Sequence, residues 1–595
     1  MALKNGKKVL RTLAAPIIEE FPLFILTLII ANLGVIRILH GCIVAHYGID
    51  AYEKIFRFLS VGAVMSYLLA VITYYTQKRY VKILCYSIPI SLFIVNFFLL
   101  LSFGSVLNPT YILILGETNP GEASGFIRTF LFTKNGAVTV LVLLIICAVC
   151  IAAEKYKHVI LNCTHKKWTG SIICILAVPF LINGVYNISK ITDIFHVKSL
   201  RQLDQWGGVA VQSQPDNTDV YSNLLYSLYA PRVAQKECRQ AIKLSDNLTD
   251  ATTLDNDLLN IVLIIGESYI KYHSPLYGYY LNTTPNMLRE HRNGQLFVFD
   301  NINSPYNTTS PTIKNLLSCN SIGLHEEWQD SPYVPVIFKK SGFKVYFWDN
   351  QNVTHAVWDF TLNSFLHNQE LSKVSYTAEN KDTYDYDGKL IQSFLSQNFP
   401  TTQNTFTMLH LWGQHVPAKD RYPHTAPYNR FTPDSITVKK PWLTRAMRQA
   451  IAEYDNATYY NDALIGKVIN HYRHTNAVIV YISDHGEETY DWRANMGRNA
   501  KPMCTNVVKY QFDVPFVIWC SDKYQARHPQ TMKAIKASLH KPMSSDIICN
   551  MLFDLADLKT RYYRLSLDIL SKSYHCPKRI VLDKYNYDIL RFPRQ

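Results

Sequence analysis

Five long apolar stretches dominate the first 190 residues of the chain. They run over Phe21–Ile36 (continuing past Arg37 to Ala45), Phe58–Tyr75, Ile83–Phe103, Gly136–Ala153 and Trp168–Tyr186. A helix that crosses a bilayer needs about 20 predominantly apolar residues. Five such runs in one third of a chain are not typical of the buried helices of a soluble protein. The pattern therefore predicts an N-terminal transmembrane bundle of five helices over residues 1–186.

The charged residues between these stretches predict an orientation. Lys and Arg concentrate before the first stretch and in the second and fourth linkers, whereas the first and third linkers carry the acidic Asp50, Glu53, Glu117 and Glu122. Basic linkers remain in the cytoplasm. Because the number of predicted spans is odd, everything after Tyr186 is expected on the opposite side of the membrane.

A different pattern begins near residue 259. Short β-branched runs alternate with helical patterns such as Pro311–Leu317 and Ala446–Tyr472; the runs are Ile261–Ile265, Val345–Trp348, Phe406–Leu411, Ala477–Ile482 and Val514–Trp519. This alternation predicts an α/β domain over residues 259–595 with a mostly parallel central sheet covered on both faces. Functional sites of such domains form beyond the carboxyl ends of the strands.

Residues 187–258 bridge the two predicted domains. The bridge contains Gly207-Gly208 and polar runs, but also the apolar stretch Tyr221–Tyr229. A plain linker is one interpretation. We expect partly helical segments that lie against the membrane surface.

The charge distribution excludes one class of partner. The first 190 residues carry 17 Lys and Arg against 7 Asp and Glu, so +10 of the net charge of +14 lies there. The large polar domain has no strong basic excess, so nucleic-acid binding is not expected. The 48% hydrophobic content also excludes a disordered chain.

Ionisable residues follow two of the predicted strands. Glu267 comes directly after Ile261–Ile265, and Asp484 and His485 come directly after Ala477–Ile482. Carboxylate oxygen and imidazole nitrogen are both zinc ligands. A helix-start carboxylate and a hydrogen-bonded turn are the structural alternatives for these two clusters.

Two further clusters supply a nucleophile and neutralising groups. His410 and His415 lie at the end of the run Phe406–Leu411, where either could bind a phosphate or a second metal, or pack as a structural histidine. Thr309 precedes Pro311, which suits a first helical turn. Thr309 is then either an ordinary N-cap residue or a hydroxyl group at a helix N-terminus, where the backbone N–H groups favour a bound phosphoryl group. The combined set suits metal-assisted phosphoryl transfer through a covalent intermediate.

The ordered series of motifs resembles the phosphoethanolamine transferases of Gram-negative inner membranes, which carry a periplasmic sulfatase/alkaline-phosphatase-like domain. The resemblance rests on Thr118-Asn119-Pro-Gly-Glu122-Ala123, Ile265-Gly266-Glu267-Ser268, Leu276-Tyr277-Gly278-Tyr279, Thr284-Pro285, Phe343–Asn350, His410–His415 and Ser483–Glu487. It implies transfer of phosphoethanolamine from phosphatidylethanolamine to a lipopolysaccharide acceptor, by a multi-pass inner-membrane protein whose catalytic domain is periplasmic. The oligomeric state is left open.

The resemblance also implies residue roles. Glu267, Thr309, Asp484 and His485 would hold a catalytic zinc ion, with manganese as the alternative metal. Thr309 would be the nucleophile that becomes phosphoethanolaminylated. His410 and His415 would contact the phosphoryl group or a second metal. Glu487, His355 and Arg498 would contact substrate or phosphate. Arg498 stands where many members of the family have a further histidine, and it would supply a positive charge in place of that histidine.

Two departures from the family, Arg498 in place of a further histidine and the absence of two cysteines, leave the acceptor open between lipid A and a core sugar. Cysteines that flank the nucleophile in many lipid A-modifying members are absent here, where Pro305 and Asn315 occupy that stretch.

A phosphoglycerol transferase resembling lipoteichoic acid synthases remains the alternative function. A true sulfatase would need a Cys/Ser-x-Pro-x-Arg motif, which the sequence lacks. A non-catalytic membrane sensor is disfavoured by the intact set of metal-ligand candidates.

Six cysteines fall in the part of the chain beyond the predicted spans: Cys238, Cys319, Cys504, Cys520, Cys549 and Cys576. An oxidising compartment would allow them to form up to three disulfides. Buried reduced thiols are the alternative.

Overall fold

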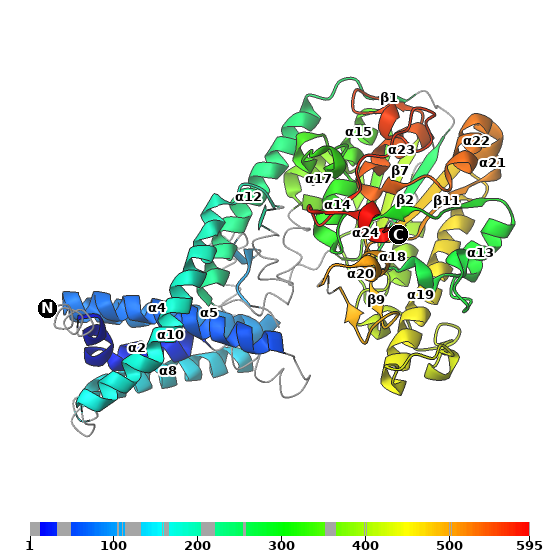
Figure 1. Ribbon diagram of the computed structural model, residues 1–595. Helices are drawn as coiled ribbons and strands as arrows, with labels where there is room; N and C mark the ends of the chain where they lie inside the picture. Colours follow the sequence, from blue (N-terminus) through cyan, green and yellow to red (C-terminus); the bar gives the residue numbers. More distant parts are fainter. Residues whose placement is uncertain are drawn as a thin grey trace. The chain divides into compact units, whose positions relative to one another are not determined.

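The computed structural model describes residues 12–32, 49–103, 106–109, 111–112, 133–157, 159, 166–200, 202–203, 220–253, 258–351, 365–397, 399, 402–498, 500 and 502–593 (Figure 1). The chain forms two compact units; the first ends at Ala234 and the second begins at Gln235. This division falls within one long helix, α12 (Val220–Asp246). The predicted bridge is therefore helical over much of its second half, and its position at a membrane surface stays a prediction.

The first unit is made of helices that pack through small and polar side chains. It contains α2 (Phe21–Ala31), α4 (Ile49–Thr76), α5 (Arg79–Phe103), α8 (Lys134–Lys155) and α10 (Lys166–Thr192). Helices α4 and α10 pack closely at Gly184, where a Cβ atom would lie 2.2 Å from the carbonyl oxygen of Ser60. Asn183 Nδ2 also donates to Ser60 Oγ at 2.9 Å. Small residues that allow backbones to approach, with polar contacts beside them, are typical of membrane helix interfaces.

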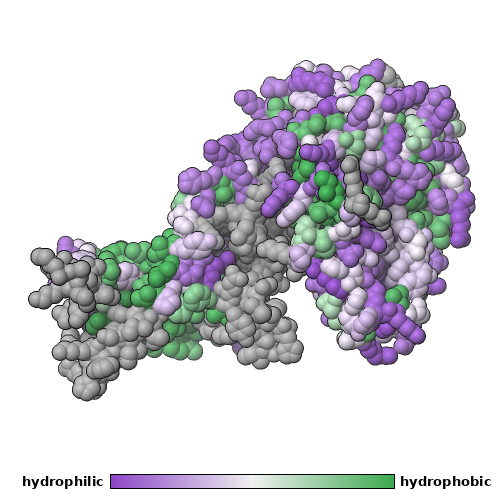
Figure 2. Space-filling model, in the orientation of Figure 1, coloured by the Kyte–Doolittle hydropathy of each residue, from purple (hydrophilic) through white to green (hydrophobic). Residues whose placement is uncertain are grey.

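The length and composition of these helices partly agree with the predicted spans. Among the described residues, three helices are long and apolar enough to cross a membrane: Ile55–Thr76, Arg79–Ser102 and Lys134–Lys155. Many of their large apolar side chains are exposed, and Figure 2 shows apolar surface over this unit. Such surface is not expected to face water. Helix α10 covers the predicted fifth span, and the count of five stays a prediction.

The first predicted span differs from expectation. A helical segment Thr12–Glu19 and α2 form a bent pair with an angle of 77° between them, which together would make a fourth span. Pro22 occupies the first turn of α2, and proline favours the start of a helix because it cannot donate a backbone hydrogen bond. Glu20, at the bend, pairs with Lys82 at 2.6 Å. The continuation to Ala45 lies outside the described residues after Asn32.

The second unit is built on a seven-stranded sheet in its described part. The strand order is β3 (Leu296–Phe299), β11 (Phe516–Cys520), β8 (Ala477–Ser483), β2 (Asn260–Gly266), β7 (Thr405–His410), β5 (Lys344–Asp349) and β6 (Ala378–Glu379). The five predicted strands are confirmed to within two residues at each end. The sheet is mixed, since β11 runs antiparallel to both neighbours while β8, β2, β7, β5 and β6 pair in parallel.

Helices cover both faces of this sheet. On one face, α19 (Arg445–Tyr472) packs with α13 (Pro285–Arg292) and α18 (Asp387–Leu395) over the core that includes Val262 and Ile264. On the other face, Phe338 of α15 (Val334–Lys340) stacks on Phe406 of β7 with ring centroids 4.0 Å apart, and Phe553 of α23 (Ile548–Leu555) lies beside it. Both faces are buried, so strands such as β2, with the sequence NIVLIIG, are continuously apolar.

The cysteines of the second unit stand as free thiols in the structure: Cys238, Cys319, Cys504, Cys520, Cys549 and Cys576. Four of them are buried, and the other two are partly exposed. This arrangement corresponds to the second of the two alternatives considered from sequence.

Candidate active site

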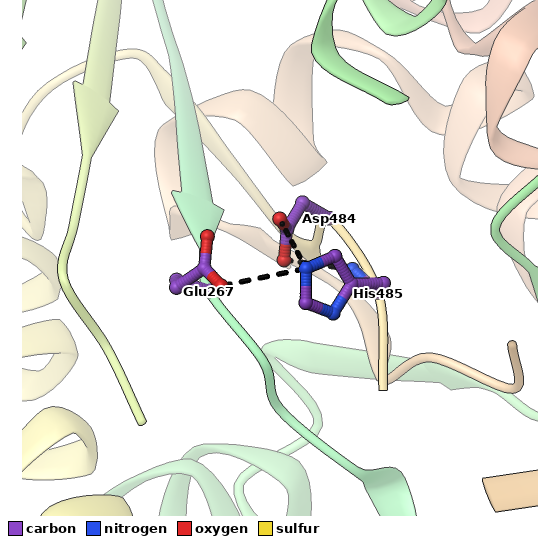
Figure 3. Close-up of side chains that lie close together, drawn as sticks. All are labelled: Glu267, Asp484 and His485. Carbon is purple, nitrogen blue, oxygen red and sulfur yellow. Dashed lines mark hydrogen bonds and ion pairs between the residues drawn. The ribbon is translucent and has the colours of Figure 1, made fainter. Parts of the chain in front are cut away.

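The ends of β2 and β8 bring three ionisable side chains together. The two strands are parallel neighbours, with Gly266 opposite Ser483, so the residues that follow them emerge side by side. His485 Nε2 lies 3.1 Å from Asp484 Oδ2 and 3.4 Å from Glu267 Oε1 (Figure 3). All three side chains are fully buried. One ligand atom from each lies within 4.8 Å of the others, which is close enough to hold one metal ion.

Backbone contacts fix which atoms face the centre. Asp484 Oδ1 accepts the backbone N–H groups of Ser268 (3.0 Å) and His485 (2.7 Å), which leaves Oδ2 toward the histidine. His485 Nδ1 donates to the carbonyl oxygen of Gly486 at 2.9 Å, so the lone pair of a neutral imidazole is on Nε2. Hydrogen bonds of this kind to the backbone orient side chains that bind a metal.

The turn after β2 has a strained backbone, and a tyrosine of α19 holds it in place. Ser268 has φ of +55°, a left-handed conformation that is costly for a residue with a side chain. The Tyr454 hydroxyl donates to the Ser268 carbonyl oxygen at 2.6 Å and accepts the backbone N–H of Ile270 at 2.9 Å. Strain of this kind is often retained at functional sites.

The electrostatics of the three residues favour a bound cation. Burial raises the pKa of Asp484 well above its ordinary value, and the negative charge of Glu267 raises it further. Burial alone would raise the pKa of Glu267 too, but its surroundings, which include the positively charged Arg498, hold that pKa below its usual range. Burial lowers the pKa of His485 to about 3, so its imidazole is neutral. Two buried carboxylates beside a neutral imidazole are a donor set that fits a divalent metal ion such as zinc.

Thr309 adds a hydroxyl to this set. It is the first residue of α14 (Thr309–Leu316), and its Oγ1 donates to Glu267 Oε2 at 2.9 Å and lies 3.4 Å from His485 Nε2. Thr308 precedes the helix in an extended conformation, is exposed, and makes no side-chain capping bond. The hydroxyl that reaches the metal-ligand candidates is therefore that of Thr309.

His410 is oriented by residues of the neighbouring strand. Its Nδ1 lies 2.8 Å from Asp349 Oδ1, and the second oxygen of Asp349 lies 2.7 Å from His367 Nε2. The two histidines hold the pKa of Asp349 below its usual range despite burial. His410 Nε2 is buried and has no hydrogen-bond partner in the described part of the chain. That nitrogen remains available for a ligand.

The loop from His410 to His415 lies against Glu267. Gly413 has φ of +48°, and a Cβ atom there would lie 2.8 Å from both the nitrogen and the oxygen of the Glu267 backbone, so only glycine fits. Gln414 N–H donates to the Glu267 carbonyl oxygen at 3.0 Å. Burial lowers the pKa of His415 to about 4, which keeps it neutral.

Arg498 and Glu487 complete the cluster. Arg498 Nη1 lies 2.6 Å from His485 Nε2, and Arg498 Nε lies 3.4 Å from Glu487 Oε2. Burial raises the pKa of Glu487 to about 7. The guanidinium thus lies beside the metal-ligand candidates, and it occupies the nitrogen through which His485 would bind a metal.

Sequence reasoning missed three residues and named two features that the structure does not describe. His367 and Asp349 orient His410, and Gln351 Nε2 lies 3.2 Å from Glu267 Oε2. Asp349 is the last residue of β5 and Gln351 comes shortly after it, so the rule that places sites at strand ends could have found them. His355 and the motif Thr118–Ala123 lie outside the described residues.

Comparison with known proteins places the domain in a family. Residues 259–558, half of the chain, match the family model described as Sulfatase. The chain belongs to the sulfatase family. Its sulfatase domain includes all three metal-ligand candidates and Thr309.

Individual relatives cover less of the chain. Phosphoethanolamine transferase EptC of Escherichia coli (strain K12) is 28% identical over 280 residues, which are 46% of this chain and 47% of that protein. Phosphoethanolamine transferase CptA of Salmonella typhimurium is 25% identical over 335 residues, 56% of each chain. The chain thus spans about half the length of these curated relatives.

A solved structure supports the fold of the sulfatase domain. The C-terminal periplasmic domain of EcEptC from Escherichia coli is 25% identical, covers 58% of this chain and 98% of that one, and superposes with a TM-score of 0.50. A second crystal structure of that domain, in complex with Zn, has the same TM-score and is 24% identical.

Proposed function

We propose that this protein transfers phosphoethanolamine from phosphatidylethanolamine to a lipopolysaccharide acceptor, through a phosphoethanolaminyl-Thr309 intermediate at a zinc site. One observation carries the proposal: the Thr309 hydroxyl donates to Glu267 at 2.9 Å beside Asp484 and His485. The similarity to proteins named phosphoethanolamine transferases supports it. It also favours this function over a phosphoglycerol transferase.

The metal would be held by Glu267, Asp484, His485 and Thr309. When bound, a zinc ion supplies positive charge that lowers the pKa of a bound hydroxyl and neutralises a phosphoryl group. Because Arg498 now donates to His485 Nε2, metal binding at that nitrogen would release the guanidinium toward Glu487 and the substrate phosphate. The Zn complex of the related EcEptC domain supports zinc over manganese as the metal.

The first half-reaction would form the intermediate. Thr309 Oγ1, whose hydroxyl donates to Glu267 Oε2, gives up its proton and attacks the phosphorus of the donor. The bond from phosphorus to the glycerol oxygen breaks. That oxygen takes up the proton, and diacylglycerol leaves. His410, His415 and the N-terminus of α14 would stabilise the negative charge on the phosphoryl oxygens.

In the second half-reaction, Thr309 Oγ1 would be the leaving group instead of the nucleophile. An acceptor oxygen attacks the same phosphorus, its proton passes to Thr309 Oγ1, and the bond between Thr309 and phosphorus breaks. Two half-reactions on one nucleophile make ping-pong kinetics. His355 and Glu487 would contact substrate.

The domain plan and location belong to the same proposal. Residues 1–186 would cross the inner membrane five times, residues 187–258 would form a bridge near the membrane surface, and residues 259–595 would act in the periplasm.

Incubation of the purified full-length chain with headgroup-labelled phosphatidylethanolamine and lipopolysaccharide tests this function. Label should appear in lipopolysaccharide, and a chelator should prevent its transfer. Transfer of label from phosphatidylglycerol instead would contradict the proposed donor.

A further inference from the structure

A hairpin near the end of the chain contacts the segment that leads to Thr309. The hairpin and the helix after it are β14 (Ile580–Val581), β15 (Tyr585–Asn586) and α24 (Tyr587–Arg591), coloured red in Figure 1. The match to the sulfatase family ends at residue 558, so these elements lie beyond it. They are therefore candidates for a part of the site that is particular to this chain.

Two hydrogen bonds join the tip of the hairpin to the segment before the nucleophile. The backbone N–H of Leu582 donates to the Pro305 carbonyl oxygen at 3.0 Å. The hydroxyl of Tyr306, which is buried, donates to Asp583 Oδ1 at 2.5 Å. Adjacent residues of the hairpin tip thus bind adjacent residues of the segment, four and three positions before Thr309.

The backbone of the hairpin tip is strained. Lys584 N–H donates to the Val581 carbonyl oxygen at 3.3 Å, and the two residues between them, Leu582 and Asp583, have φ of +49° and +60°. Turns of this kind usually carry glycine, asparagine or aspartate, and a leucine there is costly. Strain persists where surrounding contacts fix the conformation, and it is common near functional sites.

The base of the hairpin is anchored in the sulfatase domain. The fully buried Arg579 donates through Nη1 to the carbonyl oxygen and the side-chain oxygen of Asn301, at 3.1 and 2.8 Å. The Tyr587 hydroxyl donates to Asp513 Oδ1 at 2.5 Å, and Val581 packs in the same apolar cluster as Tyr587. The tip therefore rests on a fixed support.

The contacts of Tyr306 continue into the first turn of α14. Thr308 makes no side-chain capping bond, so the start of this helix depends on the preceding segment. The Ser304 hydroxyl donates to the Tyr306 carbonyl oxygen at 2.6 Å, and the Thr312 hydroxyl donates to the Thr308 carbonyl oxygen at 2.8 Å. The backbone from Tyr306 to Thr309 is thus held at both ends.

We propose that Asp583 is a positioning residue for the nucleophile. It holds Tyr306, and through it the segment that keeps the Thr309 hydroxyl directed at Glu267. The inference rests on the proposed function and deepens it, because it adds a residue beyond the family match to the support of the nucleophile. Displacement of a reacting atom by about 1 Å costs up to about 100-fold in rate. A hairpin that only stabilised the fold would change the melting temperature and leave the rate of attack by Thr309 unchanged.

Diacylglycerol release from phosphatidylethanolamine without acceptor measures this attack in a single turnover of the full-length chain. The test variants are Tyr306→Phe, Asp583→Ala and their combination. Asp583→Asn is the conservative variant, because its amide oxygen still accepts the hydroxyl and asparagine tolerates a left-handed backbone. Lys584→Ala, which removes an exposed side chain of the same turn, is the control. Bound metal and the KM for the donor would be measured alongside.

Both single variants should release diacylglycerol about tenfold more slowly than wild type, with bound metal unchanged and the donor KM within twofold. The combined variant should be no slower than either single variant, because all three lack the same hydrogen bond. Asp583→Asn should recover to within threefold of wild type, and the control should match wild type. Tyr306→Phe leaves the sequence of the turn intact, so it tests the bond even if Asp583→Ala fails to fold.

A wild-type rate of release in Tyr306→Phe would overturn the role of Asp583, and so would a slower release that is accounted for by lost metal or by a raised KM. The proposed function would survive either result. A wild-type chain that releases no diacylglycerol would instead contradict the proposed function, and with it this inference.

Discussion

Asp349 Oδ1 and His410 Nδ1 lie 2.8 Å apart, and both side chains are fully buried. Asp349 also accepts from His367 through its second oxygen, so one carboxylate fixes two imidazoles. This leaves His410 Nε2 as the nitrogen that is free to meet a ligand. The relationship makes Asp349 a positioning residue for the proposed phosphoryl site.

Asp349→Asn should lower transfer activity by about 10–100-fold, the usual cost of losing a partner that orients an active-site histidine. The loss should appear in kcat more than in the KM for the donor, because the variant disturbs the orientation of His410 and leaves donor-binding groups in place. Steady-state kinetics of the full-length enzyme would measure this. Asp300→Asn is the matched control, since Asp300 pairs with His540 at the surface, and it should keep wild-type activity. A fully active Asp349→Asn enzyme would show that His410 needs no such support.

His485→Ala and Asp484→Asn should lose bound transition metal. Two buried carboxylates repel each other without a cation, so removal of the metal should also lower the melting temperature. Elemental analysis of purified protein and thermal unfolding with and without chelator would measure both effects. His471→Ala, an exposed histidine near the end of α19, is the control and should retain metal. Wild-type protein without any transition metal would contradict the metal assignment.

His273 should make stability depend on pH. Burial would lower its pKa, but Asp455 at 2.7 Å and Asp491 at 3.4 Å raise it to about 10. The folded-state pKa therefore exceeds the unfolded value of about 6.5. The stabilisation is complete below pH 6.5 and is lost as the pH rises through about 10.

The variant His273→Gln should accordingly lower the melting temperature most at pH 6. Breaking a buried ion pair costs about 3–5 kcal/mol. The difference from wild type should shrink between pH 7 and pH 10, as followed by thermal unfolding at a series of pH values. A difference that stays constant over this range would show that His273 is not charged in the folded protein.

Reporter fusions test the predicted orientation of the membrane domain. A fusion after Tyr186 should be active only as a periplasmic reporter, and a fusion after Lys157 only as a cytoplasmic one, because the basic linkers are expected to remain inside. Cytoplasmic activity after Tyr186 would contradict the model of five spans.

Much of the site was predictable because adjacent parallel strands deliver their following residues to one place. Glu267 and Asp484 are 217 positions apart in the sequence, yet β2 and β8 pair directly and bring them together. His367 could not be found this way, since it precedes α17 (Gln369–Ser375) in a loop and reaches Asp349 through tertiary packing. The bend before α2 was also missed, since hydropathy averages over Glu20 and Pro22 instead of locating a break.

Arg498 shows a further limit of prediction from the sequence. Its sequence position suggested a positive charge near the site, but not that its guanidinium would lie 2.6 Å from His485 Nε2. That contact depends on how residues 488–498 fold back: β9 (Glu488–Thr489) pairs with β10 (Met496–Gly497) just before Arg498. Such short strands carry little periodic signal.

The central claim is that Thr309 carries the transferred group, and intact-mass analysis with peptide mapping tests it most directly. Full-length enzyme would be incubated with phosphatidylethanolamine and no acceptor. One added phosphoethanolaminyl group should map to Thr309, should be absent in Thr309→Ala, and should remain in Thr308→Ala, whose exposed side chain makes no capping bond. The account would be contradicted by an adduct on Thr308 or Ser310, by a Thr309→Ala enzyme that keeps substantial transfer activity, or by the absence of any adduct on a chain that transfers the group.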